Sequence, residues 1–310
     1  MKKYALLFLK GMAMGAADIV PGVSGGTVAF ISGIYEELVD SIRSLTPAAL
    51  LVWYRQGFVA FWRHINGSFL LTLVAGIVFS LLSLAKAVTY CLEHYPLHLW
   101  GFFFGLVLAS GVYISRGLPL RQLGIWVALA IGVAIALGVS VARPVELPGE
   151  WWMVFIAGAI AICAMILPGI SGSFLLLLMG LYAFMLRALL DLNLLIIASF
   201  VAGCIVGLLL FSHLLSWLLH RYHDWTLALL TGFLFGSLNI VWPWKQTLET
   251  FIDRHGNELP LRQANLLPEQ FASLGGDPHT WAVIGLAVVG FVLVLILEAV
   301  AHWGKKAEAK

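Results

Sequence analysis

The chain has 310 residues, of which 61% are apolar and 11% are charged, and its net charge is +2. A soluble domain has about 45–50% apolar and about 25% charged residues, so this composition and a mean hydropathy of +0.96 exclude an ordinary soluble globule and indicate an integral membrane protein. The small net charge, with no basic run interleaved with aromatics, excludes a nucleic-acid-binding protein. The cysteines lie in apolar stretches and read as packing residues, neither a disulfide framework nor a metal set: Cys91, Cys163 and Cys204.

The first element of the chain is an apolar stretch that is broken in its middle. Residues 6–20 are largely apolar, residues 21–27 read PGVSGGT, and residues 28–39 are again largely apolar. Proline removes a backbone donor and glycine permits turns closed to other residues, so we expect a helical hairpin over residues 5–40. Lys10 and Asp18 interrupt the apolar run, which argues against a cleaved signal peptide.

The rest of the chain contains six continuous apolar stretches and a second broken one. A membrane-spanning helix needs about 20 apolar residues. The second hairpin is expected over residues 151–190, around the sequence LPGISGS at 167–173. Residues 243–279 form a long loop to which the sequence assigns no role. The expected spans are 69–91, 97–115 and 123–142 before the second hairpin, and 194–219, 225–242 and 280–301 after it.

The two halves of the chain resemble each other in order. The pentapeptide PGVSG at 21–25 matches PGISG at 168–172, and GIY at 33–35 matches GLY at 180–182. We therefore predict a duplication, with a first repeat over residues 1–145 and a second over 146–310. Two further blocks recur: VAG at 74–76 and 201–203, and GFFFG at 101–105 against GFLFG at 232–236.

The distribution of positive charge predicts how the repeats are oriented. If each hairpin enters and leaves on one side, each half makes an odd number of crossings and the halves are inverted. Most Lys and Arg residues then lie on the side of both termini, as the positive-inside rule requires of the cytoplasm. We expect an all-α integral membrane protein with both termini in the cytoplasm and with an inverted repeat, each half a re-entrant hairpin plus three transmembrane helices. The charge rule does not distinguish re-entrant from fully spanning hairpins, but the short helices favour re-entrant ones.

The breaks have the composition of an anion site. Backbone N–H groups at a helix N-terminus bind anions, and a non-helical break within lipid must be buried in protein or line a polar cavity. Inverted repeats with broken helices are typical of secondary transporters, and two such loops that enter from opposite faces are expected to meet near the middle of the membrane and form one polar site. The alternative is that the breaks are only helix caps and close-packing turns. The candidate substrate-binding residues are Ser24, Gly25, Gly26 and Thr27 in the first break, and Ser171, Gly172 and Ser173 in the second.

Several ionisable residues are weaker candidates. Asp18 lies in the apolar zone, where a carboxylate is costly and usually functional, and it is a candidate to carry H⁺ or Na⁺ or to cap a helix. Glu37 and His213 are further candidates for coupling, with a solvated helix end and a packed histidine as the alternatives. Lys86 and Arg187 are candidates to attract a phosphate, against ordinary interfacial positions.

The motifs resemble the bacterial polyprenyl-phosphate transporter family. The resemblance rests on GAADIVPGVSGGT at 15–27, GIYE at 33–36, LPGISGS at 167–173 and WPW at 242–244, and it runs from about residue 5 to 300. It implies that the chain lies in the bacterial plasma membrane and returns undecaprenyl phosphate, a carrier lipid of cell-wall precursors, from its outer to its inner leaflet. It points to Asp18 and to the seven residues of the two breaks.

A small inorganic anion channel or ion-coupled exchanger is the alternative function, because paired helix N-termini suit that role equally well. The chain contains no Walker loop or HExxH motif, so we expect no enzyme, cofactor or metal. The expected partners are a polyprenyl phosphate, the bilayer, and H⁺ or Na⁺ if transport is coupled. The sequence leaves the oligomeric state open.

Overall fold

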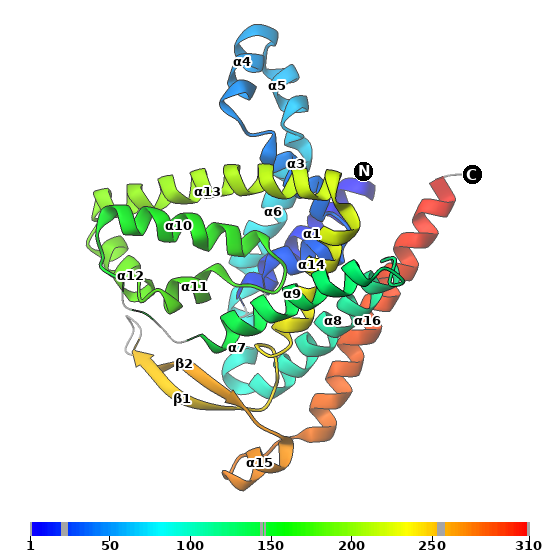
Figure 1. The fold of residues 1–310 in the computed structure, drawn as a ribbon, viewed down its shortest axis with the longest axis vertical. Helices are drawn as coiled ribbons and strands as arrows, with labels where there is room; N and C mark the ends of the chain where they lie inside the picture. Colours follow the sequence, from blue (N-terminus) through cyan, green and yellow to red (C-terminus); the bar gives the residue numbers. More distant parts are fainter. Residues whose placement is uncertain (1, 20–23, 143–144, 146, 253–257, 309–310) are drawn as a thin grey trace. The chain divides into compact units, whose positions relative to one another are not determined.

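The computed structural model describes residues 2–19, 24–142, 145, 147–252 and 258–308 (Figure 1). The chain divides into two compact units, one of residues 1–88 and 145–226, the other of residues 89–144 and 227–310. Each unit takes segments from both halves of the sequence. The two units therefore do not coincide with the two predicted sequence repeats, 1–145 and 146–310, and the repeats stay a prediction.

The first unit is helical and contains both broken regions. Its helices up to the start of α7 come from the first half of the chain, and those from α10 onward come from the second. Helices α7 and α14 each cross from one unit to the other. The helices of this unit are α1 (Lys2–Ile19), α2 (Gly25–Ile31), α3 (Tyr35–Arg43), α4 (Pro47–Gln56), α5 (Phe58–His64), α6 (Gly67–Ser83), α7 (Ala85–His94), α10 (Trp151–Ile166), α11 (Gly172–Leu178), α12 (Tyr182–Leu190), α13 (Leu194–Arg221) and the start of α14 (His223–Ser237).

Two helix pairs of the first unit pack backbone to backbone through glycine. Helix α1 packs along α6, and helix α10 packs along α13, as the ribbon shows. A Cβ on Gly76 of α6 would clash with the carbonyl oxygen of Phe8, and a Cβ on Gly203 of α13 would clash with that of Phe155. Gly76 and Gly203 belong to the two VAG blocks. Small residues at such positions allow close approach of membrane helices, where packing and not the hydrophobic effect drives association.

Each broken region contains three helices, one more than the sequence analysis expected. The additional break falls at Gly33 in the first region and at Gly180 in the second, where φ is +68° and +67°. Glycine adopts this left-handed conformation without the steric cost that a Cβ brings. Helices α11 and α12 meet there at an angle of 102°.

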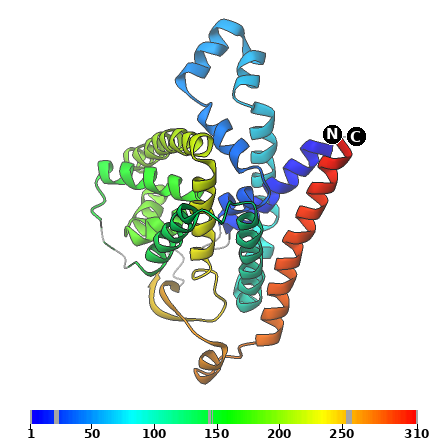
Figure 2. The same ribbon diagram turned by 45° about the vertical axis from the view of Figure 1, so that its right-hand side comes forward.

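The segment between α3 and α6 forms a pair of short helices, α4 and α5. Figure 2 shows this pair extending away from the other helices of the first unit. Trp53 of α4 stacks on Phe61 of α5 with a centroid distance of 5.6 Å, and large apolar side chains such as Tyr54 and Phe58 are exposed. Exposed aromatic side chains on short helices are typical of segments that lie in a membrane interface.

The second unit packs α8 against α16 and adds a β-hairpin. Gly105 of α8 lies against the backbone of Ala287, and Gly132 of α9 lies against Gly232 of α14. Strands β1 and β2 pair antiparallel, with Lys245 opposite Asn265. Its elements are the rest of α7 and α14, with α8 (Pro96–Arg116), α9 (Leu123–Val141), β1 (Lys245–Ile252), β2 (Glu258–Asn265), α15 (Pro268–Ser273) and α16 (Thr280–Glu308).

The apolar helices make this a multi-pass membrane protein. Among the described residues, three helices are long and apolar enough to span a membrane, or up to five if each of two bent pairs counts as one span. The three are α8, α9 and α13, which match the expected spans at 97–115, 123–142 and 194–219. The expected span at 69–91 differs: α6 ends at Ser83, and a separate helix, α7, begins at Ala85.

Candidate functional site

The described part of the first break begins at Ser24, which caps helix α2. Residues 20–23 of this break lie outside the described residues. Ser24 is the N-cap of α2 in extended conformation, and its hydroxyl accepts a hydrogen bond from the backbone N–H of Thr27 at 3.3 Å. The backbone N–H of Gly25 donates to Asp18 Oδ1 at 2.6 Å. A carboxylate of the protein therefore already occupies the amide end of α2, the kind of position that suits an anion.

The two breaks contact each other directly. The backbone N–H of Gly169, in the second break, donates to the Thr27 hydroxyl of the first at 2.8 Å. The Ser24 hydroxyl donates to the carbonyl oxygen of Leu167 at 3.3 Å. A Cβ on Gly26 would lie 2.5 Å from the carbonyl oxygen of Ile166, so only glycine allows this approach. Ser24 and Thr27 are almost completely buried.

The second break differs from the first in its charge. The Ser171 and Ser173 hydroxyls are 2.9 Å apart, and Ser173 is exposed. Met165 stands at the position that matches Asp18 when the two PG blocks are aligned. A Cβ on Gly172 would lie 2.7 Å from Met165 Cγ, as one on Gly25 would lie 2.8 Å from Asp18 Oδ2. An apolar thioether thus borders the amide end of α11, where a carboxylate borders that of α2.

Much of the hydrogen-bonding capacity of the breaks is used within the protein. The hydrogen-bonding groups of Thr27, Ser24 and Gly169 bond to one another, as buried polar groups require. This agrees with the alternative that the breaks are helix caps and close-packing turns. The polar side chains at the breaks that reach the surface of this unit are those of Asp18 and Ser173. A ligand phosphate would meet the breaks at these two residues, beside the exposed side chain of Met165.

The four remaining sequence candidates lie outside the breaks. Lys86 is exposed on α7, beyond the end of α6, and Arg187 is exposed on α12. Glu37 on α3 accepts a hydrogen bond from Asn66 at 3.1 Å. His213 on α13 bonds the carbonyl of Leu209 through Nδ1 at 2.7 Å. Within the described part of the chain, none of the four bonds to the residues of the two breaks.

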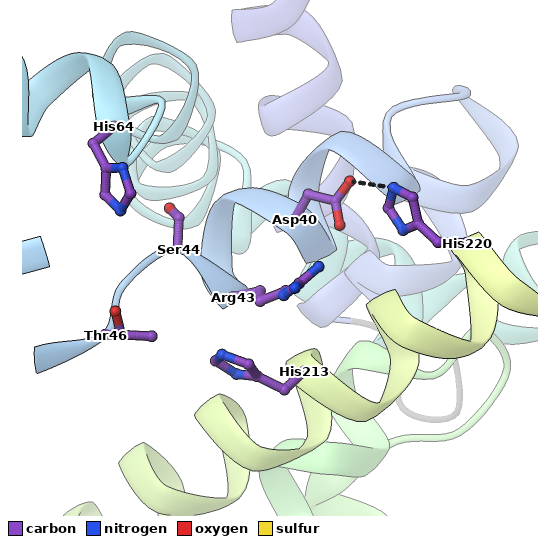
Figure 3. A pocket seen from close by; sticks show the side chains of 7 residues that line it. All are labelled: Asp40, Arg43, Ser44, Thr46, His64, His213 and His220. Atoms are coloured by element: carbon purple, nitrogen blue, oxygen red, sulfur yellow. Dashed lines mark ion pairs between the residues drawn. The ribbon is translucent and has the colours of Figure 1, made fainter. Parts of the chain in front are cut away.

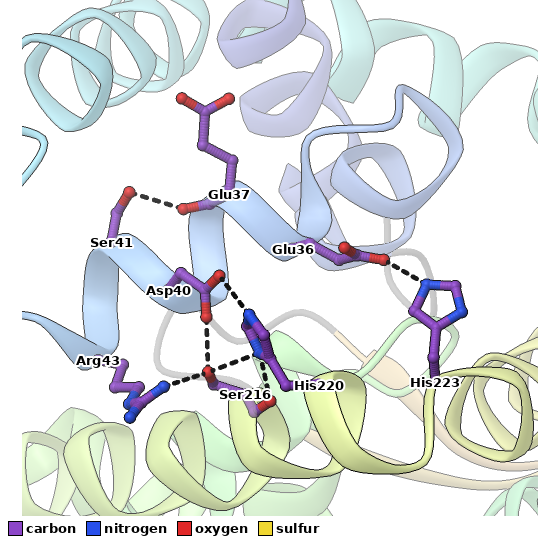
Figure 4. Close-up of polar contacts among 8 residues, drawn as sticks. All are labelled: Glu36, Glu37, Asp40, Ser41, Arg43, Ser216, His220 and His223. Atoms are coloured by element: carbon purple, nitrogen blue, oxygen red, sulfur yellow. Dashed lines mark hydrogen bonds and ion pairs between the residues drawn. The ribbon is translucent and has the colours of Figure 1, made fainter.

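A second polar cluster joins α3 to α13 and α14 (Figure 4). Asp40 accepts a hydrogen bond from Ser216 at 2.6 Å, and Ser216 accepts one from Arg43 at 2.9 Å. His223, which precedes the apolar part of α14, bonds Glu36 at 3.0 Å. Partial burial lowers the pKa of His223, but hydrogen bonds to Asp224 and Glu36 outweigh it and raise that pKa above its usual value.

The sequence predicted that the two breaks meet, but it did not identify the pair that joins them, the Gly169 N–H and the Thr27 hydroxyl. The cluster of Asp40, Arg43 and Ser216 was also missed, because it joins residues far apart in the chain and Ser216 lies in an apolar run.

The fold and the two breaks indicate the class of protein. They describe a multi-pass α-helical membrane protein with two contacting broken helices, the architecture of a transporter. The chain belongs to the undecaprenyl phosphate translocase-like family, whose model matches residues 14–259. This confirms the expected resemblance.

Two curated relatives support the assignment. A polyprenyl-phosphate transporter of Vibrio cholerae serotype O1 is 49% identical over 300 residues, covering 96% of this chain and 97% of the relative. A polyprenyl-phosphate transporter of Staphylococcus aureus is 31% identical over 253 residues, covering 76% and 85%. Both relatives are transporters by name, which agrees with the expectation that the chain is not an enzyme. No solved structure matches the chain significantly.

Proposed function

We propose that the protein translocates undecaprenyl phosphate from the outer to the inner leaflet of the bacterial plasma membrane. The names of the relatives support a polyprenyl-phosphate substrate. The observation that carries the proposal further is the direct contact of the two breaks through Gly169 and Thr27. Moving a charged head group through hydrocarbon is the barrier to be lowered, and two polar breaks in one apolar helical unit offer a polar surface for that head group.

The head group binds, in this proposal, where the breaks reach the surface of their unit. Ser173 and the amide end of α11 provide donors that are not faced by a carboxylate. Helices α2 and α11 have only seven residues each, so N–H and O–H groups, more than a helix dipole, stabilise the phosphate. The isoprenoid tail remains in lipid, against exposed apolar side chains such as Met165 and Ile160.

Asp18 provides a route to ion coupling. Its carboxylate holds the N–H of Gly25 at 2.6 Å, so a phosphate that takes this N–H must displace it. Two anions at one site repel each other, and protonation of Asp18 or a bound Na⁺ relieves that repulsion. Transport in this scheme is coupled to H⁺ or Na⁺, and Asp18→Asn uncouples it.

The inverted repeat remains part of the proposal. The glycine contacts of α1 with α6 and of α10 with α13 involve matching sequence blocks, which supports a duplication. The positive-inside rule supports opposite orientations for the halves, with both termini in the cytoplasm. The re-entrant character of the hairpins fits the short helices on either side of each break.

The test is leaflet exchange of undecaprenyl phosphate in proteoliposomes that contain the full-length protein. We expect exchange that depends on the protein and that changes in Asp18→Asn. A parallel flux assay with chloride and inorganic phosphate, in liposomes without the lipid substrate, tests the alternative. Anion flux without lipid exchange would replace this proposal with an anion channel or exchanger.

A further inference from the structure

A polar pocket lies away from the two breaks, between α3, α13 and the segment that enters α4 (Figure 3). Its volume is about 380 Å³, within the range of about 300–1,000 Å³ that is usual for ligand sites. All the elements that form it belong to the first unit. Its lining side chains are polar or titratable, which is unusual in a unit whose helices are otherwise mostly apolar.

Arg43 is the principal donor of this α3–α13 pocket. One of its guanidinium nitrogens donates to Ser216 at 2.9 Å, which fixes the side chain against α13. Arginine has five N–H donors in a planar fork suited to phosphate. Across the residues that the structure describes, no carboxylate pairs directly with Arg43, because Asp40 accepts its bond from Ser216 and lies 3.7 Å from His220.

Three histidines complete the pocket. His213 and His220 each use Nδ1 to bond the carbonyl oxygen four residues earlier on α13, at 2.7 and 2.8 Å. This local bond leaves Nε2 of His213 for other partners, whereas Nε2 of His220 lies 3.7 Å from Asp40. In Figure 3 the ring of His213 points into the pocket from α13, and that of His64 from the opposite wall.

The charge of the lining residues indicates that the pocket binds an anion and not a metal cation. The positive charge of Arg43 repels a metal cation, and no group of metal-binding residues occurs among the described residues. The one carboxylate, Asp40, is held on the α13 side by Ser216 and His220. Thr46 adds a hydroxyl to the lining, and Ser44 lines it with a hydroxyl that already donates to the carbonyl oxygen of Ser41 at 2.6 Å. Arginine, histidine and hydroxyl groups together are the donors that recognise a phosphate monoester.

We propose that the α3–α13 pocket binds a phosphate group, as a station separate from the two breaks. The ligand is the head group of a lipid phosphate monoester or free inorganic phosphate. The lipid source rests on the proposed function. In the orientation that the positive-inside rule favours, the pocket is on the cytoplasmic side, where a translocated head group leaves the protein.

The test measures binding and transport separately, with full-length protein purified in detergent. Inorganic phosphate and undecaprenyl phosphate are titrated against wild type, Arg43→Gln and His213→Gln. His94→Gln is the matched control, because exposed His94 bonds the carbonyl of Tyr90 in the same way on α7, outside the pocket. A charge-assisted hydrogen bond contributes about 1.5–3 kcal/mol, so each pocket variant should bind at least about tenfold more weakly.

Each outcome has one meaning. Weaker binding of both probes in the two pocket variants supports a shared phosphate site. An effect on the lipid alone, or on inorganic phosphate alone, supports the pocket and identifies the source. Unchanged binding of both probes in His213→Gln, which leaves the bond between Arg43 and Ser216 intact, overturns the inference. If the wild-type protein binds both probes, with weaker binding in the pocket variants, but does not exchange the lipid between leaflets, only the proposed function is refuted.

Discussion

The substitution Thr27→Val tests whether the two breaks stabilise each other. Valine has nearly the shape of threonine, so the change removes a hydroxyl and leaves the packing in place. In wild type that hydroxyl accepts the N–H of Gly169 at 2.8 Å, an ordinary hydrogen-bond length. Thr27 is 1% exposed and Gly169 is also buried, so the variant leaves a buried donor without this acceptor.

The expected loss follows from that unsatisfied donor. A buried polar group deprived of its partner costs about 1–3 kcal/mol in unfolding free energy. Thr231→Val is the matched control, because Thr231 is 0% exposed and its hydroxyl donates only to the carbonyl of Leu227, one turn earlier. That carbonyl keeps its backbone partner in α14, so the control should lose no more than about 1 kcal/mol.

The assay is denaturation in mixed micelles, followed by tryptophan fluorescence, with both variants prepared in the same detergent. We expect Thr27→Val to be clearly less stable than Thr231→Val and to exchange lipid more slowly. Equal unfolding free energies for the two variants, within about 0.5 kcal/mol, would refute the reasoning, because the contact between the breaks would then contribute nothing.

Three further predictions concern packing and charge. Gly26→Ala should lose about 1–3 kcal/mol by overpacking, whereas Gly138→Ala, where a Cβ meets nothing within 4 Å, should not; the same denaturation assay compares them. The pKa of His223 is raised in the folded state, so its pairing with Glu36 stabilises the fold below about pH 6.5. This stabilisation is lost as the pH rises through the folded-state pKa. Unfolding free energies of wild type and Glu36→Gln should therefore differ at about pH 6 and converge at high pH. Burial lowers the pKa of Lys245, which lies over the ring of Trp100, to about 8, so wild-type unfolding free energy should rise from pH 8 to about pH 10, and Lys245→Met should not show this rise.

The sequence predicted three apolar spans closely, those of α8, α9 and α13, because length and composition decide whether a segment can span a bilayer. The expected span at 97–115 and helix α8 agree to within a residue at each end. The paired breaks were also predictable, since Pro, Gly and Ser interrupt long apolar runs there. The additional breaks at Gly33 and Gly180 were visible as matched blocks, but a positive φ cannot be read from a glycine alone.

The remaining features depend on tertiary contacts that a linear pattern does not contain. The β-hairpin of β1 and β2 replaces part of the long loop expected at 243–279. Its strands carry charged and polar residues such as Glu249 and Gln263, and their pairing includes register shifts near Glu249, which weaken the alternation that signals a strand. The α3–α13 pocket joins residues from distant segments. The sequence singled out His213 as a candidate because it is polar within an apolar span, but it gave no reason to single out Arg43.

The most direct test of the central claim compares leaflet exchange of undecaprenyl phosphate by Ser173→Ala and Ser83→Ala in proteoliposomes with equal amounts of folded protein. Both serines are exposed; Ser173 lies at the breaks, whereas Ser83 bonds only its own helix. We predict slower exchange in Ser173→Ala and wild-type exchange in Ser83→Ala. Wild-type exchange in both variants would contradict the claim that the breaks carry the phosphate head group.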